Sequence, residues 1–356
     1  MNNDVLRIKA TTLTPVTIRT GREYSPFEYM VEDGHVLRFL PSHLYSLLTD
    51  QEKNSFTKTL SSQNMCVIRN EIRRLALARR TDLKVLYRIR IAESFAAIYK
   101  PQIESIHKIN DQNALHIGEC ARSLGGFYLP GSSLKGALRT ALLYAIYAPQ
   151  GSVPDKLDRD FEKNAFGYTS PFDDPFRDLI VTDSRPIPTE QIMVASLKRG
   201  RSKGIPTSSE VIDTGAEFEF EIRIRRKGAL SKKHIVFSAK TIRDACNQYY
   251  QQRVLGRYES AIRDIRPDPN NPKKGEEHIQ RLRDLLSLLH ERVGSSLTDR
   301  EWVMNIGFGG GAVNKFITPQ IYDSINRKSK LVPETFWKVD SQPLGWIKCQ
   351  LIEGTA

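Results

Sequence analysis

One short run of residues constrains the fold of this chain most strongly. From Glu217 to Arg225, charged and apolar residues alternate strictly. A period of two sends successive side chains to opposite faces of a β-strand, so the run predicts a strand with one buried face. The residues predicted to lie on that face are Phe218, Phe220, Ile222 and Ile224.

Further strands are predicted where β-branched and apolar residues gather between turn residues. Residues 6–18 form one such run, which ends before Thr20 and Gly21, and a polar, aromatic loop is expected after it. Residues 179–181 and 192–194 form two more.

Helices are predicted where apolar residues recur three and four positions apart. This spacing occurs within residues 41–100, where it includes Leu83 and Tyr87, and again over residues 241–265 and 276–293. The chain therefore mixes helices and strands along most of its length.

The most informative stretch covers residues 130–140, where Pro and Gly precede two serines and a helical pattern. Ser132 or Ser133 is a good N-cap for this helix. The free N–H groups at a helix start carry partial positive charge and can hold a phosphate. Lys135 and Arg139 lie four residues apart, opposite the apolar stripe, and are predicted to point away from the core. The alternative is a capped helix whose serines and glycines are only structural.

Two glycine patterns resemble nucleotide-binding loops without meeting their requirements. Gly131 and Gly136 have the spacing of a P-loop, but Ala137 stands where that motif needs lysine. Residues 307–312 fit G-x-G-x-x-A, yet too few residues follow for a dinucleotide-binding fold. A turn whose N–H groups face bound phosphates or another helix fits this glycine run better.

The charge balance of the chain favours a polyanionic partner. Lys and Arg number 53 against 41 Asp and Glu, which gives a net charge of +12. Basic residues gather between Arg69 and Lys100, where a solvated helical face is the alternative, and at the tip formed by residues 198–203. Neither a membrane-spanning stretch nor a secretory signal is visible, so we expect a cytoplasmic location and no membrane partner.

The chain offers few metal ligands in useful spacings. Its four cysteines lie far apart, which excludes a disulfide framework, and only His116 and Cys120 are close enough to begin a zinc site. One acidic cluster lies near a predicted strand, but its prolines favour turns over a two-metal centre. Its members are Asp173, Asp174, Asp178 and Asp183. We therefore predict no metal and no cofactor.

With these stretches assembled, the sequence resembles the RAMP proteins of type III CRISPR effector complexes. Four stretches carry the resemblance, and the second is the most specific. They are residues 13–21 (LTPVTIRTG), 127–140 (FYLPGSSLKGALRT), 205–218 (IPT to TGAEF) and 306–311 (IGFGGG). The length, the helical insert and the late glycine loop are most similar to the subunit that caps the backbone of the type III-A (Csm) complex at the crRNA 3′ end.

The resemblance implies an α+β fold made of two RRM-like, ferredoxin-type domains. The first would cover residues 1–227 and would contain a helical insertion over about residues 37–114. The second would cover residues 228–356, would be degenerate, and would carry the glycine-rich loop. An RRM-like sheet of this family need not stack bases on aromatic residues, because its members recognise phosphates and shape.

The resemblance also implies a role and partners. The chain would be a non-catalytic crRNA-binding subunit of an antiviral ribonucleoprotein, supporting crRNA maturation and complex assembly. Its partners would be the 3′ portion of the crRNA, the neighbouring backbone RAMP subunit and the small helical subunit, with target RNA contacted indirectly. The residues expected to bind RNA are Arg19, Gly131, Ser132, Ser133, Lys135, Gly136, Arg139, Lys198, Arg199, Arg201, Lys203, Gly307, Gly309, Gly310 and Gly311.

The alternative function is a RAMP-type endoribonuclease that processes precursor crRNA without a metal. Such cleavage needs a positioned acid or base. His116 and Lys135 are the one pair that the sequence offers for this role.

Overall fold

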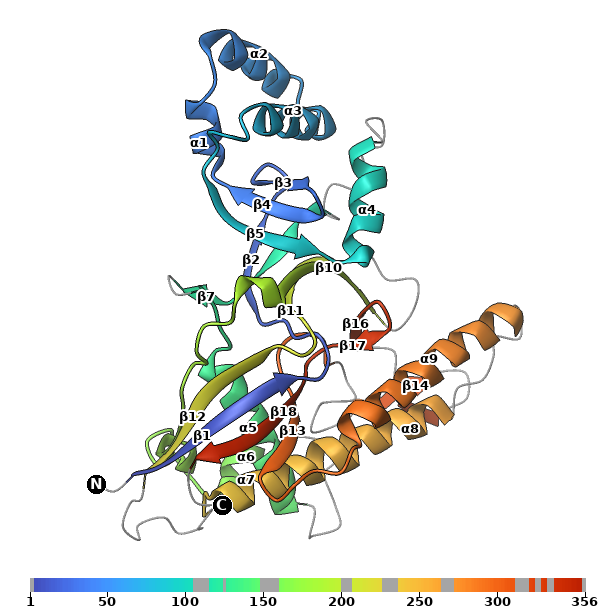
Figure 1. Ribbon diagram of the computed structural model, residues 1–356. Coiled ribbons are helices and arrows are strands. Elements are labelled where there is room, and N and C mark those ends of the chain that lie inside the picture. The colour runs from blue at the N-terminus through green and yellow to red at the C-terminus, as the bar shows by residue number, and fades with distance from the viewer. Residues whose placement is uncertain are drawn as a thin grey trace.

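Two β-sheets, which we call sheet A and sheet B, organise the chain, and the helices pack around them (Figure 1). The fold is a mixed α+β arrangement, as predicted. The computed structural model describes residues 3–104, 115–123, 126–147, 160–199, 207–225, 236–263, 272–310, 320–323, 328–331 and 336–353.

Sheet A is antiparallel at every neighbouring pair of strands. In spatial order its strands are β13 (Glu301–Asn305), β18 (Trp346–Glu353), β1 (Asn3–Thr12), β12 (Glu217–Arg225) and β9 (Leu179–Val181). Strands from both sides of residue 227 therefore share one sheet, and the domain boundary expected there stays a prediction.

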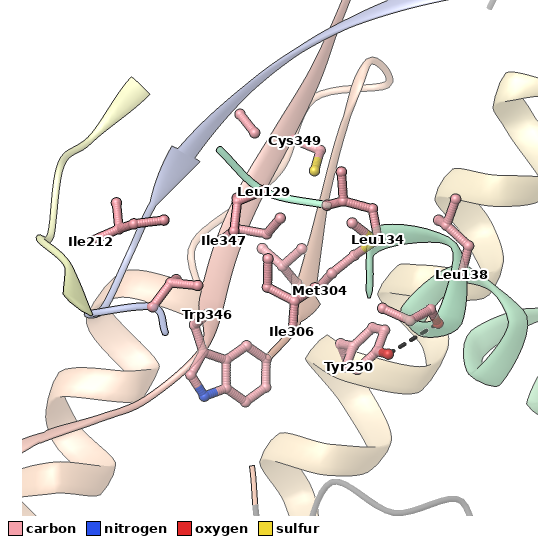
Figure 2. Packing of buried hydrophobic residues seen from close by; sticks show 14 of the residues in the cluster. Leu129, Leu134, Leu138, Ile212, Tyr250, Met304, Ile306, Trp346, Ile347 and Cys349 are labelled. Atoms are coloured by element: carbon pink, nitrogen blue, oxygen red, sulfur yellow. Dashed lines mark hydrogen bonds between the residues drawn. The ribbon is translucent and has the colours of Figure 1, made fainter. Parts of the chain in front are cut away.

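One face of sheet A is apolar and covered by helices. The alternation in β12 is confirmed, because Phe218, Phe220, Ile222 and Ile224 are all buried. Helices α5 (Gly131–Tyr147) and α7 (Ala239–Cys246) lie against this face. Figure 2 shows Leu134 of α5 on the side toward Met304 and Ile347 of the sheet, with Leu138 farther along the helix. Burial of each such side chain contributes roughly 1.5 to 3 kcal/mol of stability.

Sheet B lies above sheet A in Figure 1 and mixes parallel and antiparallel pairs. Its main path runs β2 (Arg19–Tyr24), β6 (Ile117–Cys120), β11 (Thr207–Ile212), β10 (Ile192–Arg199), β5 (Val85–Ile91), β4 (His35–Phe39) and β3 (Tyr29–Glu32). In addition β16 (Trp337–Val339) pairs with the end of β10, and β17 (Gln342–Pro343) pairs with β16.

The predicted helical insertion is partly helical and partly strand. Helices α1 (Pro41–Ser46), α2 (Asp50–Ser61) and α3 (Met65–Ala78) enclose a small separate core, and α4 (Glu93–Glu104) packs beside β10. The helical reading of Leu83 and Tyr87 is wrong, because this part of the chain enters β5 and pairs with β4 and β10. Pairing between distant strands overrides a local spacing that also fits a helix.

The strands that follow β1 correct two further expectations. The run over residues 6–18 divides, since β1 ends at Thr12 and β2 begins only at Arg19. The polar, aromatic loop after it contains the β3–β4 hairpin.

The later helices lie where they are predicted. Residues 239–263 form one continuous run made of α7, a π-helical segment (Asn247–Val254) and α8 (Leu255–Arg263), and α9 follows as Pro272–Val293. Among the described residues, no helix combines the length and apolarity that crossing a bilayer requires. The remaining short elements are α6 (Phe161–Phe166), two 3-10 turns (Pro175–Asp178 and Thr189–Gln191), and the hairpins β7–β8 (Arg122–Ser123, Gly126–Phe127) and β14–β15 (Gln320–Asp323, Lys328–Leu331).

Candidate nucleic-acid interface

Parts of all four stretches singled out in the sequence lie at one end of sheet A. Because neighbouring strands are antiparallel, β13, β1 and β9 run in the same direction and their carboxyl ends meet there. β12 and β18 begin at this end, and α5 starts beside it, since Ser184 N–H donates to the Leu129 carbonyl at 2.9 Å. We call this edge the loop end of sheet A. The glycine loop and the start of α5 lie at its two sides, roughly 20 Å apart for strands spaced about 4.8 Å.

Two arginines and two aromatic rings form a row at the glycine-loop side, which we call the arginine–aromatic row. The Arg19 guanidinium lies over the Phe308 ring, 5.3 Å from its centroid, and one of its nitrogens donates to the Glu23 carboxylate. The Phe308 and Trp337 ring centroids are 5.3 Å apart, and the Arg199 guanidinium lies 5.1 Å from the Trp337 ring. Stacking on a ring orients an arginine while its other N–H groups stay available to oxygen acceptors. The row therefore brings together residues from four distant parts of the chain. Arg199 is exposed, whereas the Arg19 side chain is only 19% exposed and is ion-paired with Glu23.

Backbone bonds hold the glycine loop against the first strand connection. Phe308 N–H donates to the Thr17 carbonyl, and Trp337 N–H donates to the Gly309 carbonyl, both at 2.8 Å. Gly307 and Gly309 have positive φ values of 77° and 105°. A Cβ at Gly307 would lie 2.4 Å from the Thr17 carbonyl oxygen, so this position requires glycine for close approach.

Gly310 completes the described part of the loop, and Gly311 lies outside the described residues. The expected packing of the glycine run against a helix is wrong for Gly307 and Gly309, which instead lie against the β1–β2 connection and against Trp337 and Leu344. Contact of Gly307, Gly309, Gly310 and Gly311 with phosphates stays a prediction.

The start of α5 differs from the predicted serine cap. The helix begins at Gly131, ahead of both serines, and the Gly131 N–H donates to Asp183 Oδ1 at 2.8 Å. One of the four free N–H groups is therefore already bound to a carboxylate. Ser132 is exposed and Ser133 half-buried, so their hydroxyl groups stay candidates for RNA contact.

Replacing Gly131 with alanine should destabilise the fold, because a Cβ there would lie 2.2 Å from the Val181 carbonyl oxygen. Such overpacking costs about 1 to 3 kcal/mol of unfolding free energy. Gly136→Ala is a matched control in the same helix, since its Cβ would meet no atom within 4 Å, and it should raise stability slightly. Urea unfolding of the two variants measures the difference, and equal midpoints would contradict the close approach at Gly131.

Lys135 and Arg139 lie on the same side of α5 but in different surroundings. Lys135 is half-buried; burial lowers its pKa, and the Asp174 carboxylate acts in the opposite direction. Among the described residues no carboxylate lies within salt-bridge distance of its ammonium group. Lys135 therefore remains a candidate for an RNA phosphate.

Arg139 does not point away from the core as predicted. Its guanidinium donates to Asp174 Oδ2 at 2.9 Å and to Glu162 Oε2 at 2.8 Å. The same group lies 4.6 Å from the Phe176 ring and 5.0 Å from the Phe166 ring, and both rings are buried. Only 21% of the side chain is exposed. The buried face of α5 is thus wider than its apolar residues indicate, because the planar guanidinium of Arg139 also packs on aromatic rings.

The predicted basic tip begins at the end of β10. Lys198 and Arg199 are exposed there, whereas Arg201 and Lys203 lie outside the described residues. Lys198 and Arg199 have no carboxylate within 4.0 Å among the residues that the structure describes.

The uncovered face of sheet A is neutralised by ion pairs. Arg7 contacts Glu353 at 2.6 Å, Lys9 contacts Glu217 at 2.9 Å, and Arg223 contacts Glu221 at 2.7 Å. Exposed large hydrophobic residues on this face are Val5 and Ile352, neither of them aromatic. Base stacking of the kind found on RRM sheets lacks its platform here, which agrees with the expected use of phosphates and shape.

The acidic cluster serves the backbone. Asp173 accepts from the N–H groups of Thr169 and Ser170, and these bonds lower the pKa of its carboxyl group far below the ordinary range. Asp174 caps the 3-10 turn at Phe176 and binds Arg139, and Asp183 binds Gly131. The prediction of turn chemistry is confirmed for Asp173 and Asp174, whereas Asp183 binds the start of α5. The described part of the chain holds no group of three or more potential metal ligands.

His116 and Lys135, the candidate catalytic pair, come from different parts of the fold. His116 directly precedes β6 in sheet B, and Lys135 lies in the second turn of α5. Within the described ranges, no hydrogen bond links His116 to Lys135.

A buried carboxylate in sheet B escapes sequence analysis altogether. Glu210 is fully buried and accepts hydrogen bonds from the Tyr24 and Tyr87 hydroxyl groups at 3.2 Å and from Cys120 N–H at 2.9 Å. Burial raises the pKa of Glu210, against the effect of Arg122 at 3.9 Å and of these donors. Arg122 itself stacks 4.2 Å from the Tyr87 ring. The cluster joins β2, β5, β6 and β11, so it fixes the sheet that carries Arg19.

Three basic or aromatic residues of the interface region are also missed by sequence analysis. Trp337 and Lys338 lie on β16, and Arg281 lies on α9. β16 has only three residues and follows a stretch without clear periodicity, so sequence offers little to find it. Arg281 carries a charge on an exposed helix face, which is indistinguishable from ordinary solvated charge.

Comparison with protein families gives one extensive match. The RAMP superfamily matches residues 9–314 of the chain. Among characterised proteins, the CRISPR system Cms protein Csm5 of Methanocaldococcus jannaschii is 23% identical over 415 residues, covering 98% of this chain and 89% of that protein. The protein of the same name from Streptococcus thermophilus is 26% identical over 242 residues, covering 62% of this chain and 65% of its own length.

Solved structures share the fold. A chain in the cryo-EM structure of a Csm–crRNA–target RNA ternary complex from a type III-A CRISPR-Cas system matches with a TM-score of 0.62 at 18% identity, covering 97% of this chain and all of that one. The crystal structure of Csm5 from T. onnurineus matches with a TM-score of 0.59 at 18% identity, covering 95% of this chain and 99% of that one.

Proposed function

The chain belongs to the RAMP superfamily, and from this premise we propose that it is a non-catalytic crRNA-binding subunit of a type III-A Csm complex. The similarity to Csm5 proteins from two organisms and to a chain of a crRNA-containing complex supports this role. A cytoplasmic ribonucleoprotein for antiviral defence is part of the proposal.

The arginine–aromatic row at the loop end of sheet A is the observation that carries the proposal. The row contains Arg19, Phe308, Trp337 and Arg199, which lie far apart in the sequence and side by side in the structure. Arginines on such a row suit phosphodiester oxygens and impose no base preference. A subunit that must accept any guide sequence needs this kind of surface.

The order of sheet A supports a ferredoxin-type core. Along the chain, β1, α5, β9, β12, α7 and β18 follow the sequence of a βαββαβ unit, and the sheet places β18, β1, β12 and β9 side by side. This is the arrangement of the split βαβ motif. We infer that the first RRM-like domain takes its fourth strand from the C-terminal part of the chain.

The proposal includes a place and partners in the complex. We assign the subunit to the crRNA 3′ end, next to the last backbone RAMP subunit and the small helical subunit, with target RNA reached through them. The match to a chain of a crRNA- and target-containing Csm complex supports this assignment. Co-purification from the native host, followed by identification of subunits and RNA, tests it; isolation without Csm subunits would contradict it.

Arg19→Gln combined with Arg199→Gln should weaken binding to single-stranded RNA by about tenfold per arginine, since 1.4 kcal/mol corresponds to a factor of ten. The slope of log affinity against log salt should fall by roughly 0.7 for each phosphate that the variant no longer binds. Arg7→Gln combined with Arg223→Gln is the control, since it removes the same net charge from arginines on the uncovered face of sheet A, outside the row. Equal salt slopes for wild type and the double variant would contradict the role of the row.

Absence of cleavage is tested separately. Purified protein incubated with repeat-containing RNA, with and without EDTA, should leave the RNA intact. Cleavage at a defined site that His116→Ala abolishes would overturn the non-catalytic assignment in favour of the endoribonuclease.

A further inference from the structure

Two lysines face each other across the β10–β16 ladder. Lys198 of β10 is the direct partner of Lys338 of β16, so their side chains project from the same face. Like charges opposite each other in a ladder destabilise it. Because this pairing lowers the stability of the isolated protein, we look for a binding role for the two charges.

The residues on either side of Lys198 and Lys338 lie on the opposite face of the same ladder. Leu197 pairs with Val339, and both are buried in a small core with Leu344. Arg199 and Trp337 alternate onto this core side and belong to the arginine–aromatic row. Because side chains alternate along a strand, Lys198 and Lys338 point away from that row. They form a second, separate basic surface.

Helix α9 adds a third cation to this second surface. Arg292 of α9 donates to Gln342 Oε1 of β17 at 2.7 Å, which fixes this face of the helix toward the β16–β17 hairpin. Arg281 precedes Arg292 by three helical turns and so lies on the same face. Figure 1 shows α9 running past β16 and β17.

Lys198 and Arg281 both act on Lys338, and no acid of the described ranges lies close to the two lysines. Lys338 is half-buried, and burial together with the charges of Arg281 and Lys198 lowers its pKa. Neither lysine has a carboxylate within 4.0 Å among the described residues, and Arg281 has only Glu277 at 3.6 Å, with both side chains more than half exposed. Such an exposed pair neutralises little charge.

We propose that Lys198, Lys338 and Arg281 form a binding site for a phosphodiester group of single-stranded RNA, on the face of the ladder opposite the arginine–aromatic row. The inference rests on the proposed RNA-binding function and adds to it a second contact with the strand. Lysine serves as a compact charge for phosphate oxygens, and the half-buried Lys338 brings that charge close to the backbone of the hairpin. The β10–β16 ladder then has cations for RNA on both of its faces.

Lys198→Gln combined with Lys338→Gln tests the site. Binding of a labelled single-stranded RNA of mixed sequence should weaken about tenfold or more, and the log–log salt slope should fall by roughly 1.4, two contacts at 0.7 each. Lys9→Gln combined with Lys348→Gln is the matched control, since it removes the same net charge from lysines that are ion-paired with Glu217 and Glu301. The control should keep the wild-type slope.

A structural readout separates the site from ordinary surface charge. Without RNA, the Lys198→Gln and Lys338→Gln variant should melt at the wild-type temperature or above, because a like-charge pair is removed. A lower melting temperature together with an unchanged salt slope would mean that the lysines only support the hairpin, and would overturn the inference.

The outcomes also distinguish this inference from the proposed function. If the wild-type protein binds RNA without salt dependence, the proposed function fails. If wild type binds and the Arg19→Gln, Arg199→Gln variant is weakened while the lysine variant behaves like its control, only the second site is wrong. Unchanged RNA affinity with loss of co-purifying subunits would show that the three cations bind a protein carboxylate, which also overturns the RNA assignment.

Discussion

Arg139→Ala is expected to lower the unfolding free energy by about 2 to 4 kcal/mol. The guanidinium bridges Asp174 and Glu162 and covers two buried rings, so truncation removes charge-assisted bonds and aromatic packing together. Charge-assisted bonds contribute about 1.5 to 3 kcal/mol and a cation–π contact about 0.5 to 1, with less from the half-exposed Glu162. Chemical denaturation of the purified protein measures the decrease.

Two control variants separate the effect of the Arg139 contacts from a general effect of removing a charge from α5. Arg139→Lys keeps the charge but not the planar fork, and should recover only part of the stability. Lys135→Ala, one turn earlier on the helix, removes no ion pair that the described residues form and should change stability by less than about 0.5 kcal/mol. Lys135→Ala is also the variant that tests RNA contact at α5. If Arg139→Ala leaves the unfolding midpoint unchanged, the packed position of Arg139 is wrong.

Glu210→Ala is expected to cost about 3 kcal/mol or more of unfolding free energy. The change leaves two tyrosine hydroxyl groups and the Cys120 N–H without their acceptor, and each unsatisfied buried group costs about 1 to 3 kcal/mol. Glu210→Gln keeps an oxygen acceptor at the same place and should retain most of the stability. Equal decreases for the two variants would show that the hydrogen bonds do not hold the sheet.

The same residue should impose a pH dependence on stability. The pKa of Glu210 is raised in the folded protein above its ordinary value of 4.5, so the native state binds more protons than the unfolded state above that pH. Its contribution is therefore fully present below the unfolded pKa and is lost as pH rises through the folded pKa. Relative to Glu210→Gln, the wild-type protein should gain stability as pH falls from about 7 toward 5. A parallel pH profile for the two proteins would contradict the raised pKa.

The elements that sequence predicts well are those whose pattern reflects one dominant environment. β12 alternates because one of its faces packs on helices and the other meets water, and α5 and α9 keep their apolar stripes for the same reason. The motifs at residues 130–140 and 306–311 are found in sequence because close backbone approach needs glycine at Gly131 and Gly307.

The failures have physical causes as well. β5 has helical spacing yet becomes a strand, because its partners β4 and β10 come from distant parts of the chain. Arg139 reads as solvent-exposed charge, because no local pattern reveals that Asp174 and two phenylalanines will surround it. Trp337 and Lys338 gain meaning only through their register with Arg199 and Lys198. Sequence finds local geometry, whereas these sites arise from contacts between distant segments.

The pairing of β1 with β18 has a consequence for biosynthesis. The Arg7–Glu353 contact joins residues 346 positions apart, so the central strand of sheet A is synthesised long before its neighbour β18 exists. During translation β1 can pair with β12, but its other edge stays open until β18 has left the ribosome. Open edges and late, non-local pairing slow folding and favour aggregation. Until β18 is synthesised, the open edge of β1 is therefore accessible to chaperones, and sheet A lacks the pairings of β18 with β1 and β13.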